Sequence, residues 1–289
     1  MSSNTSLNEL NIDPISRLIL SGEPFCVSRP GIGGDGIVPY LALNNMQINP
    51  HFLHTLIYNA GIYFRTDDLS HPKDKEDLIT FCQYQIDCYR ISNSCACFFD
   101  QQIMKPIYYF IQSACKTELI DYKFIEPYYL KKPWTKLLEG KKILVVSPFA
   151  DTIQKQYQKR DLLFENKDIL PEFNLICYKS PMTLAGNKIH ESWKTTFDIM
   201  WNEIKQLDFD VALLGCGGYG HPLCLHIRKE LNKSCVYIGG ALQILFGIMG
   251  KRWENMPIIS RLKNQHWCYP SAEETCENNT MIEGGSYWK

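Results

Sequence analysis

The sequence has no long hydrophobic run and no excess of charge of either sign. No apolar stretch reaches about 18 residues, so a membrane-spanning helix is not expected. Its 30 basic and 31 acidic residues give a net charge of −1, which excludes the strongly basic surface typical of nucleic-acid-binding proteins. The polar beginning, Met1–Asp13, lacks the apolar core of a signal peptide. We therefore expect a cytoplasmic globular protein that binds neither nucleic acid nor membrane.

The sequence also lacks the short motifs of several enzyme classes. It contains no G-x-S-x-G, which is typical of serine hydrolases, and no H-E-x-x-H, which is typical of metalloproteases. Cysteine, by contrast, is abundant with 12 residues, but Cys95 and Cys97 are too close in the chain for a common zinc knuckle. The scatter of the cysteines through apolar segments predicts reduced, mostly buried thiols.

Strand-like and helix-like segments alternate in the second part of the chain. Lys142–Ser147 is a continuous apolar run, as expected for a central parallel strand that is covered on both faces. The pattern predicts further strands at 173–178, 211–214 and 235–238, and helices at 151–164, 193–207 and 222–231. This alternation predicts a parallel sheet flanked by helices.

A boundary between two parts is expected at Glu126–Gly140, where Pro, Lys and Gly interrupt the apolar pattern. We predict an α/β protein with two Rossmann-like halves: a mixed N-terminal domain over residues 1–130 and a C-terminal domain over residues 131–289. In the first half a strand is expected at Pro24–Ser28. Helices are expected there at 50–60, 78–89 and 101–115.

The clearest motif is the glycine loop, Gly215–Gly220 (GCGGYG), between a predicted strand and Pro222. Glycines let the backbone approach a ligand, and a helix N-terminus favours a phosphate. The predicted ligand-binding residues here are Gly215, Gly217, Gly218, Tyr219, Gly220 and His221. The alternative is a packing turn that binds nothing.

The spacing of the glycine loop also satisfies G-x-G-x-x-G, the pattern of dinucleotide-binding proteins. Such proteins carry an Asp or Glu about twenty residues later to hold the ribose, whereas this chain has Ile238–Gly240 there. A sugar-nucleotide site is therefore favoured over a nicotinamide dinucleotide site.

Two further segments are expected at the same ligand-binding edge of the sheet. Gly239 and Gly240 end a predicted strand and are followed by a helix-like run. Lys251 and Arg252, next to Trp253, could bind a phosphate and stack on a base or sugar. A basic surface turn is the alternative for this last group.

The first half contributes the arginine loop, Arg29–Gly36 (RPGIGGDG), after a short predicted strand. Arg29 could bind a diphosphate through two parallel hydrogen bonds, and Asp35 could hold a divalent cation or act as a base. Gly33 and Gly34 are expected to bring the backbone close to the ligand. Two such loops in separate halves predict a cleft between them.

Several blocks together resemble a family of uncharacterised proteins that occur beside polysaccharide and glycan genes. The blocks include RPGIGGDG at 29–36, GKKILVVSPF at 140–149, GCGGYGHP at 215–222, GKRW at 250–253 and EGGSYW at 283–288. The layout is similar to that of GT-D-type glycosyltransferases, whose R-I-G-D-G-E block supplies a D-x-E pair for a sugar nucleotide. Here Gly34–Gly36 fits the G-D-G core, and Ile37 stands at the position of the glutamate.

These features predict a glycosyltransferase that moves a sugar from a nucleoside diphosphate sugar to a glycan acceptor. Arg29 and the glycine loop would hold the diphosphate, and Asp35 would act as base or as a ligand of Mn²⁺ or Mg²⁺. Lys251 and Arg252 would assist or replace that cation. Two alternatives stay open: an NAD-dependent sugar-nucleotide dehydrogenase or epimerase, and a non-catalytic protein that binds a nucleotide or sugar phosphate. A homodimer is compatible with each of them.

Overall fold

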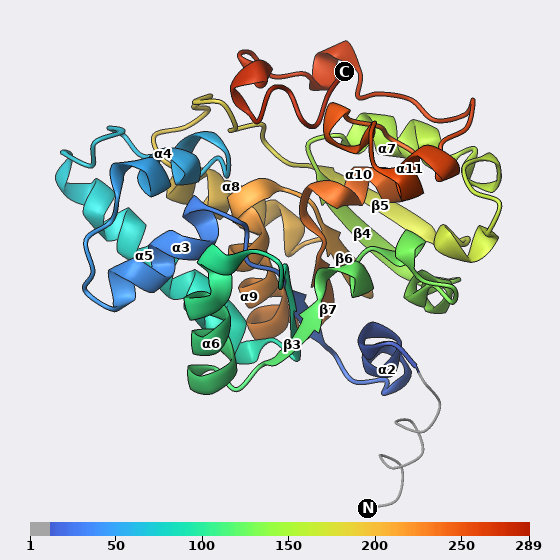
Figure 1. The fold of residues 1–289 in the computed structure, drawn as a ribbon, viewed down its shortest axis with the longest axis horizontal. Coiled ribbons are helices and arrows are strands. Elements are labelled where there is room, and N and C mark those ends of the chain that lie inside the picture. The colour runs from blue at the N-terminus through green and yellow to red at the C-terminus, as the bar shows by residue number, and fades with distance from the viewer. Residues whose placement is uncertain (1–11) are drawn as a thin grey trace, which may run out of the picture.

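Seven parallel strands form the centre of the protein in a computed structural model that describes residues 12–289 (Figure 1). The strand order is β3-β2-β1-β7-β6-β4-β5. The strands are β1 (Cys26–Ser28), β2 (Ser94–Cys97), β3 (Glu118–Asp121), β4 (Lys142–Ser147), β5 (Asn174–Lys179), β6 (Val211–Leu214) and β7 (Ser234–Tyr237). The predicted α/β class, with a parallel sheet flanked by helices, is confirmed.

The sheet is continuous across the boundary predicted near residue 130. Strand β1 pairs with β2 on one side and with β7 on the other, so that Cys26 lies opposite Cys235 and Val27 lies opposite Val236. Strands from the first and second parts of the chain therefore share one hydrogen-bonded ladder. The connection from β3 to β4, where the boundary was predicted, joins the two outer regions of this sheet.

The second part of the chain folds nearly as the pattern predicts. The predicted helices at 193–207 and 222–231 are found as α8 (Trp193–Ile204) and α9 (Gly220–Leu231). Helix α7 (Ala150–Tyr157) is shorter than predicted, and a 3₁₀ turn at Arg160–Leu162 replaces its last turns. After β7 come α10 (Leu242–Leu245) and α11 (Pro257–Leu262).

The first part contains more regular structure than the sequence indicates. Three predicted helices are found as α4 (Pro50–Tyr58), α5 (Pro72–Ile91) and α6 (Lys105–Ala114). Two helices, α2 (Pro14–Leu20) and α3 (Gly34–Leu43), were not predicted, and neither were β2 and β3. Glycine and proline inside α3 conceal its helical pattern, because both residue types are poor helix formers.

Both faces of the sheet are buried, which explains the continuous apolar runs. Val145 and Leu213 belong to one core cluster, whereas the neighbouring residues Leu144 and Ala212 belong to another on the opposite face. Successive strand residues point to opposite faces, so each strand contributes to both clusters. Helices α5, α8 and α9 supply residues to the second cluster, and α7 and α10 supply residues to the first.

The C-terminal segment, residues 263–289, contains two short 3₁₀ turns and an isolated β-bridge from Cys268 to Ile248, and lies alongside α7, α10 and α11 (Figure 1, red). Its buried Glu274 accepts hydrogen bonds from the backbone N–H groups of Asp151 and Thr152, at 2.9 and 3.2 Å, and so caps α7. The Trp288 indole donates to the Glu274 carbonyl at 2.9 Å. These contacts hold the segment against the sheet edge where β4 ends.

Within residues 12–289, no helix combines the length and hydrophobicity needed to cross a bilayer.

Candidate functional site

A cavity of about 410 Å³ lies at the carboxyl ends of the strands. Its wall includes residues that follow or end six of the seven strands: Arg29 after β1, Phe98 after β2, Pro148 after β4, Ser180 after β5, Gly215 after β6 and Tyr237 at the end of β7. Ligands of open parallel α/β sheets bind at this edge. The cavity joins the arginine loop to the glycine loop, whose first residues are 186 positions apart in the sequence (215 − 29).

Arg29 is one of four charged residues in the cavity wall, with Asp35, Arg252 and Glu283. Its guanidinium carbon lies 5.2 Å from the ring centroid of Phe98 and 5.6 Å from that of Tyr237. No carboxylate of the described chain forms a salt bridge with Arg29, and its buried Nε atom has no hydrogen-bond partner there. Buried donors of this kind usually have a hydrogen-bond partner, so the unpartnered Nε atom makes Arg29 a candidate anion-binding residue.

Gly239 is what makes room for this arginine. Its backbone has a φ of +74°, which favours glycine, and a Cβ atom added there would lie 2.1 Å from the Arg29 Nη2 atom. Gly239 therefore lies beneath the guanidinium rather than in the cavity wall, and its predicted role in ligand contact is indirect.

Asp35 lies in the first turn of α3 and lines the cavity. Its carboxylate packs against Gly31, where an added Cβ atom would lie 2.1 Å from Oδ1. Burial raises the pKa of Asp35, and the nearby charge of Arg29 opposes that rise. Ile37 is 4% exposed and belongs to a core cluster, so α3 brings no second carboxylate into the site.

The two predicted glycines of the arginine loop have different positions. Gly34 lines the cavity, and an added Cβ atom would lie 2.2 Å from the backbone nitrogen of Leu56, so the residue also lets α3 approach α4 closely. Gly33 is near Thr55 and is outside the cavity wall. The close packing of α3 on α4 fixes the position of Asp35.

Only the first half of the glycine loop reaches the cavity. Gly215 and Gly217 line it, and the Tyr237 hydroxyl donates a hydrogen bond to the Gly217 carbonyl at 2.8 Å. The N–H of Gly218 donates to the Ala60 carbonyl at 2.7 Å and is therefore already used. Tyr219 and Gly220, at the end of the loop, are buried and are absent from the cavity wall. The glycine loop thus contributes backbone to the cavity.

His221 does not contact the cavity. The side chain is fully buried, and its ring lies edge-on to Tyr89 and Tyr237, with centroids 5.1 and 4.9 Å away. Burial lowers the pKa of His221 to about 3, so the ring is neutral near pH 7. The structure places this predicted ligand residue in the core instead.

The segment after β7 contributes Gly240 and Arg252, but not Lys251. Arg252 forms an ion pair with Glu283 and lies 5.0 Å from the ring centroid of Tyr287. Lys251 is exposed, and its Nζ atom donates to the Gly284 carbonyl at 3.2 Å. The helix start expected after Gly240 is a single turn, α10, which is too short to provide a strong dipole.

The chain matches no protein-family model, no curated protein and no solved structure.

Several residues of the cavity wall were not predicted. They include Thr55, Asn59, Phe98, Phe149, Ser180–Leu184, Glu283 and Tyr287. Ser180 directly follows β5, and Phe98 directly follows β2, so the rule that ligands bind at strand carboxyl ends could have found them. The Ser180 hydroxyl is buried without a described hydrogen-bond partner. No pattern in the sequence indicates that Glu283 and Tyr287 fold back onto this edge.

Glu126 is a second unpredicted feature, close to the site. It is 8% exposed, and the Tyr128 hydroxyl donates to its Oε2 atom at 2.5 Å. Burial raises the pKa of Glu126 to about 7, while the Tyr128 hydrogen bond and the charges of Arg29 and Arg252 act in the opposite direction. Glu126 therefore lies within the electric field of both cavity arginines.

Proposed function

We propose that the protein is a glycosyltransferase that moves a sugar from a nucleoside diphosphate sugar to a glycan acceptor. The observation that carries the proposal is Arg29, a cation in a cavity wall without a described salt-bridge partner. A half-buried guanidinium with free donors favours a ligand with phosphate or carboxylate groups. The cavity volume, about 410 Å³, is within the range of small-molecule sites.

In this proposal the diphosphate binds between Arg29 and Arg252. Both arginines line the same cavity, together with backbone of Gly215, Gly217 and Gly240. Departure of a nucleoside diphosphate builds up negative charge on the leaving phosphate, and two preorganised guanidinium groups stabilise that charge. Aromatic side chains in the wall, Phe149 and Tyr287, provide flat surfaces for a base or a sugar ring.

Asp35 is the proposed general base. A carboxylate in the cavity wall can take the proton of an acceptor hydroxyl while that oxygen attacks the sugar. Burial raises the pKa of Asp35, which makes its carboxylate a stronger base than an exposed one.

The cavity does not contain the D-x-E pair expected for a bound divalent cation, because Ile37 is in the core. The carboxylates in its wall are Asp35 and Glu283, and Glu283 already pairs with Arg252. We therefore assign charge neutralisation to the arginines, and no step of the proposal passes through a metal.

Calorimetric titration with UDP, GDP, their sugar conjugates and NAD tests the ligand class. We expect at least one nucleoside diphosphate to bind, Arg29→Ala to lose that binding, and Arg261→Ala, at an exposed arginine of α11, to retain it. Addition of Mn²⁺ should change the affinity little. Preferential binding of NAD, or no binding by any of these ligands, would contradict the proposal.

A transfer assay with the donor identified in that titration then tests catalysis. Asp35→Asn keeps the size of the side chain and removes the base, so kcat should fall about 100-fold or more while donor affinity changes little. Binding without any donor hydrolysis or transfer, over a wide donor panel, would instead support the non-catalytic alternative.

A further inference from the structure

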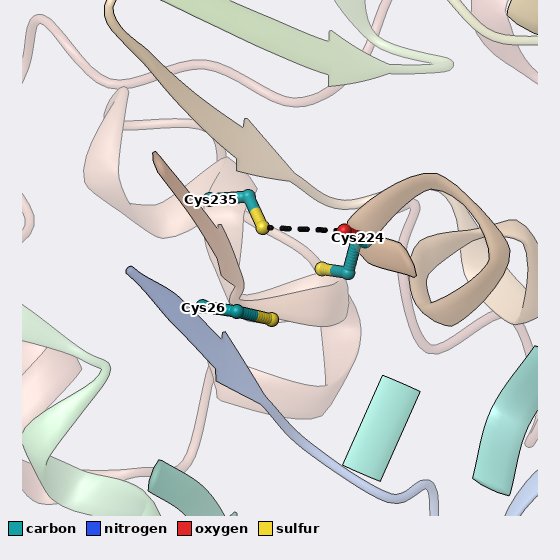
Figure 2. A group of neighbouring side chains, drawn as sticks. All are labelled: Cys26, Cys224 and Cys235. Carbon is teal, nitrogen blue, oxygen red and sulfur yellow. Dashed lines mark hydrogen bonds between the residues drawn. The ribbon is translucent and has the colours of Figure 1, made fainter. Parts of the chain in front are cut away.

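Three cysteine thiols meet in the core, away from the cavity. The Sγ atoms of Cys26, Cys224 and Cys235 all lie within 4.8 Å of one another, and the three residues are fully buried. Figure 2 shows that Cys26 and Cys235 come from two neighbouring strands, β1 and β7, and that Cys224 comes from helix α9. The side chains point into the space between the sheet and the helix (Figure 2).

A fourth thiol, that of Cys88 on α5, borders this group. Cys88 is buried and lies outside the trio whose sulfur atoms are all within 4.8 Å of one another. The Ser92 hydroxyl lies 3.4 Å from Cys26 Sγ and 4.0 Å from Cys88 Sγ, and so touches both. Cys88 is therefore joined to the trio through the Ser92 hydroxyl, which contacts both Cys26 and Cys88.

The thiols have few other partners. The Sγ atom of Cys235 has one weak hydrogen bond, to the Cys224 carbonyl at 3.8 Å, and all four residues are free cysteines. Sulfur is a soft donor, and a group of four thiolates with no carboxylate or carbonyl ligand favours zinc over magnesium, calcium or manganese.

We propose that Cys26, Cys88, Cys224 and Cys235 bind one zinc ion. Four sulfurs at about 2.3 Å from a tetrahedral zinc lie about 3.8 Å from one another. The separations of up to 4.8 Å among Cys26, Cys224 and Cys235 require only a small inward movement of these side chains, whereas Cys88, outside that trio, has to move further to become the fourth ligand. Binding releases the four thiol protons, and the ion links β1 to β7 and both strands to the helices above them.

Metal analysis of the purified full chain tests this proposal. Protein from zinc-supplemented cells, passed through a chelating resin, should contain about one zinc per chain. Cys26→Ala, Cys224→Ala and Cys235→Ala should each lower this content at least tenfold. Cys82→Ala is the matched control, because Cys82 is also buried and is on the same helix as Cys88, yet is outside the group.

Cobalt substitution keeps the proposal testable if those variants do not fold. The unaltered chain, unfolded under reducing conditions and refolded with Co²⁺, should show thiolate-to-cobalt charge-transfer absorption and the visible bands of a tetrahedral ion. Zinc that persists in all three variants would overturn the proposal. A metal-free purified protein that also shows no cobalt–thiolate absorption would overturn it as well.

Discussion

The arginine loop and the glycine loop lie at the same cavity but contribute to it in different ways. The arginine loop presents charged side chains, Arg29 and Asp35, whereas the glycine loop presents backbone and directs Tyr219 and His221 into the core. The two loops look alike in the sequence, since each is rich in glycine and follows a strand. The difference teaches that a glycine-rich loop in the sequence indicates the ligand-binding edge of the sheet but not the residues that contact a ligand. Side-chain burial decides which residues can make that contact.

Removal of Arg29 should have the largest effect on ligand binding. It tests whether the charged side chains of the arginine loop dominate that binding. Arg29→Ala should weaken nucleoside diphosphate binding about 100-fold, because charge-assisted hydrogen bonds are among the strongest polar contacts. Calorimetry measures the dissociation constant, and thermal unfolding confirms that the variant folds. If Arg29→Ala bound the ligand as tightly as the unaltered chain, the arginine loop would not contribute charge to binding, and the contrast with the glycine loop would fail.

The buried carboxyl of Glu126 tests how strongly burial near the two cavity arginines changes the stability of the chain with pH. The pKa of this carboxyl is about 7 in the folded chain and about 4.3 when unfolded, so the folded state holds the proton more tightly. Stability from this group is therefore present at low pH and is lost as pH rises through 7. Between pH 5 and pH 8 the loss should be about 2.5 kcal/mol.

The variant Glu126→Gln should lack this loss. Its free energy of unfolding, relative to that of the unaltered chain, should rise by about 2.5 kcal/mol from pH 5 to pH 8. Denaturant titrations at both pH values measure the difference. Glu165→Gln, at an exposed glutamate, serves as control and should show no such change. Parallel pH dependence of the Glu126→Gln variant and the unaltered chain would refute the assignment.

Gly239 tests whether the backbone beneath Arg29 holds its guanidinium in position. In Gly239→Ala the new methyl group would displace the Arg29 guanidinium, so ligand affinity should fall about tenfold, with a backbone cost of about 1 kcal/mol. Gly140→Ala is a matched control, because Gly140 has the same φ of +74° but no atom within 4 Å of an added Cβ. Equal binding by both variants would show that Gly239 does not position Arg29.

The smallest expected effect separates two adjacent cations. Arg252→Ala should weaken ligand binding severalfold, about 5- to 10-fold, because Arg252 lines the cavity but is partly neutralised by Glu283. Lys251→Ala should change the dissociation constant less than about twofold, since Lys251 is exposed and outside the cavity. Equal losses in both variants would favour the prediction made from the sequence.

Much of the sheet could be predicted because its second part has long apolar strands. Lys142–Ser147 is found at the predicted bounds, since a strand buried on both faces must be apolar throughout. Strands β2 (SCAC) and β3 (ELID) are short and carry serine, cysteine or acid, so their patterns resemble loops. The pairing of β2 with β1, and of β3 with β2, depends on tertiary contacts that a local pattern does not contain.

The candidate site was only partly predictable for a similar reason. Arg29, Asp35 and Gly215 stand directly after strands or at the start of a helix, where local pattern places ligand contacts. The burial of His221 depends on Tyr89 and Tyr237, which come from distant segments. Similarly, the return of the C-terminal segment depends on contacts such as Glu274 with α7. Long-range packing of this kind leaves no periodic signal in the sequence.

The pairing of β1 with β7 has a consequence for synthesis on the ribosome. Cys26 in β1 pairs with Cys235 in β7, which is synthesised 209 residues later (235 − 26). The side of β1 that faces β7 therefore has no strand partner while the intervening chain is made. At about 5–20 residues per second this delay is about 10–40 s. During that time the nascent chain exposes an open strand edge, which is a template for association with other chains. Elongation rate and chaperone supply should therefore govern how much of this protein escapes aggregation.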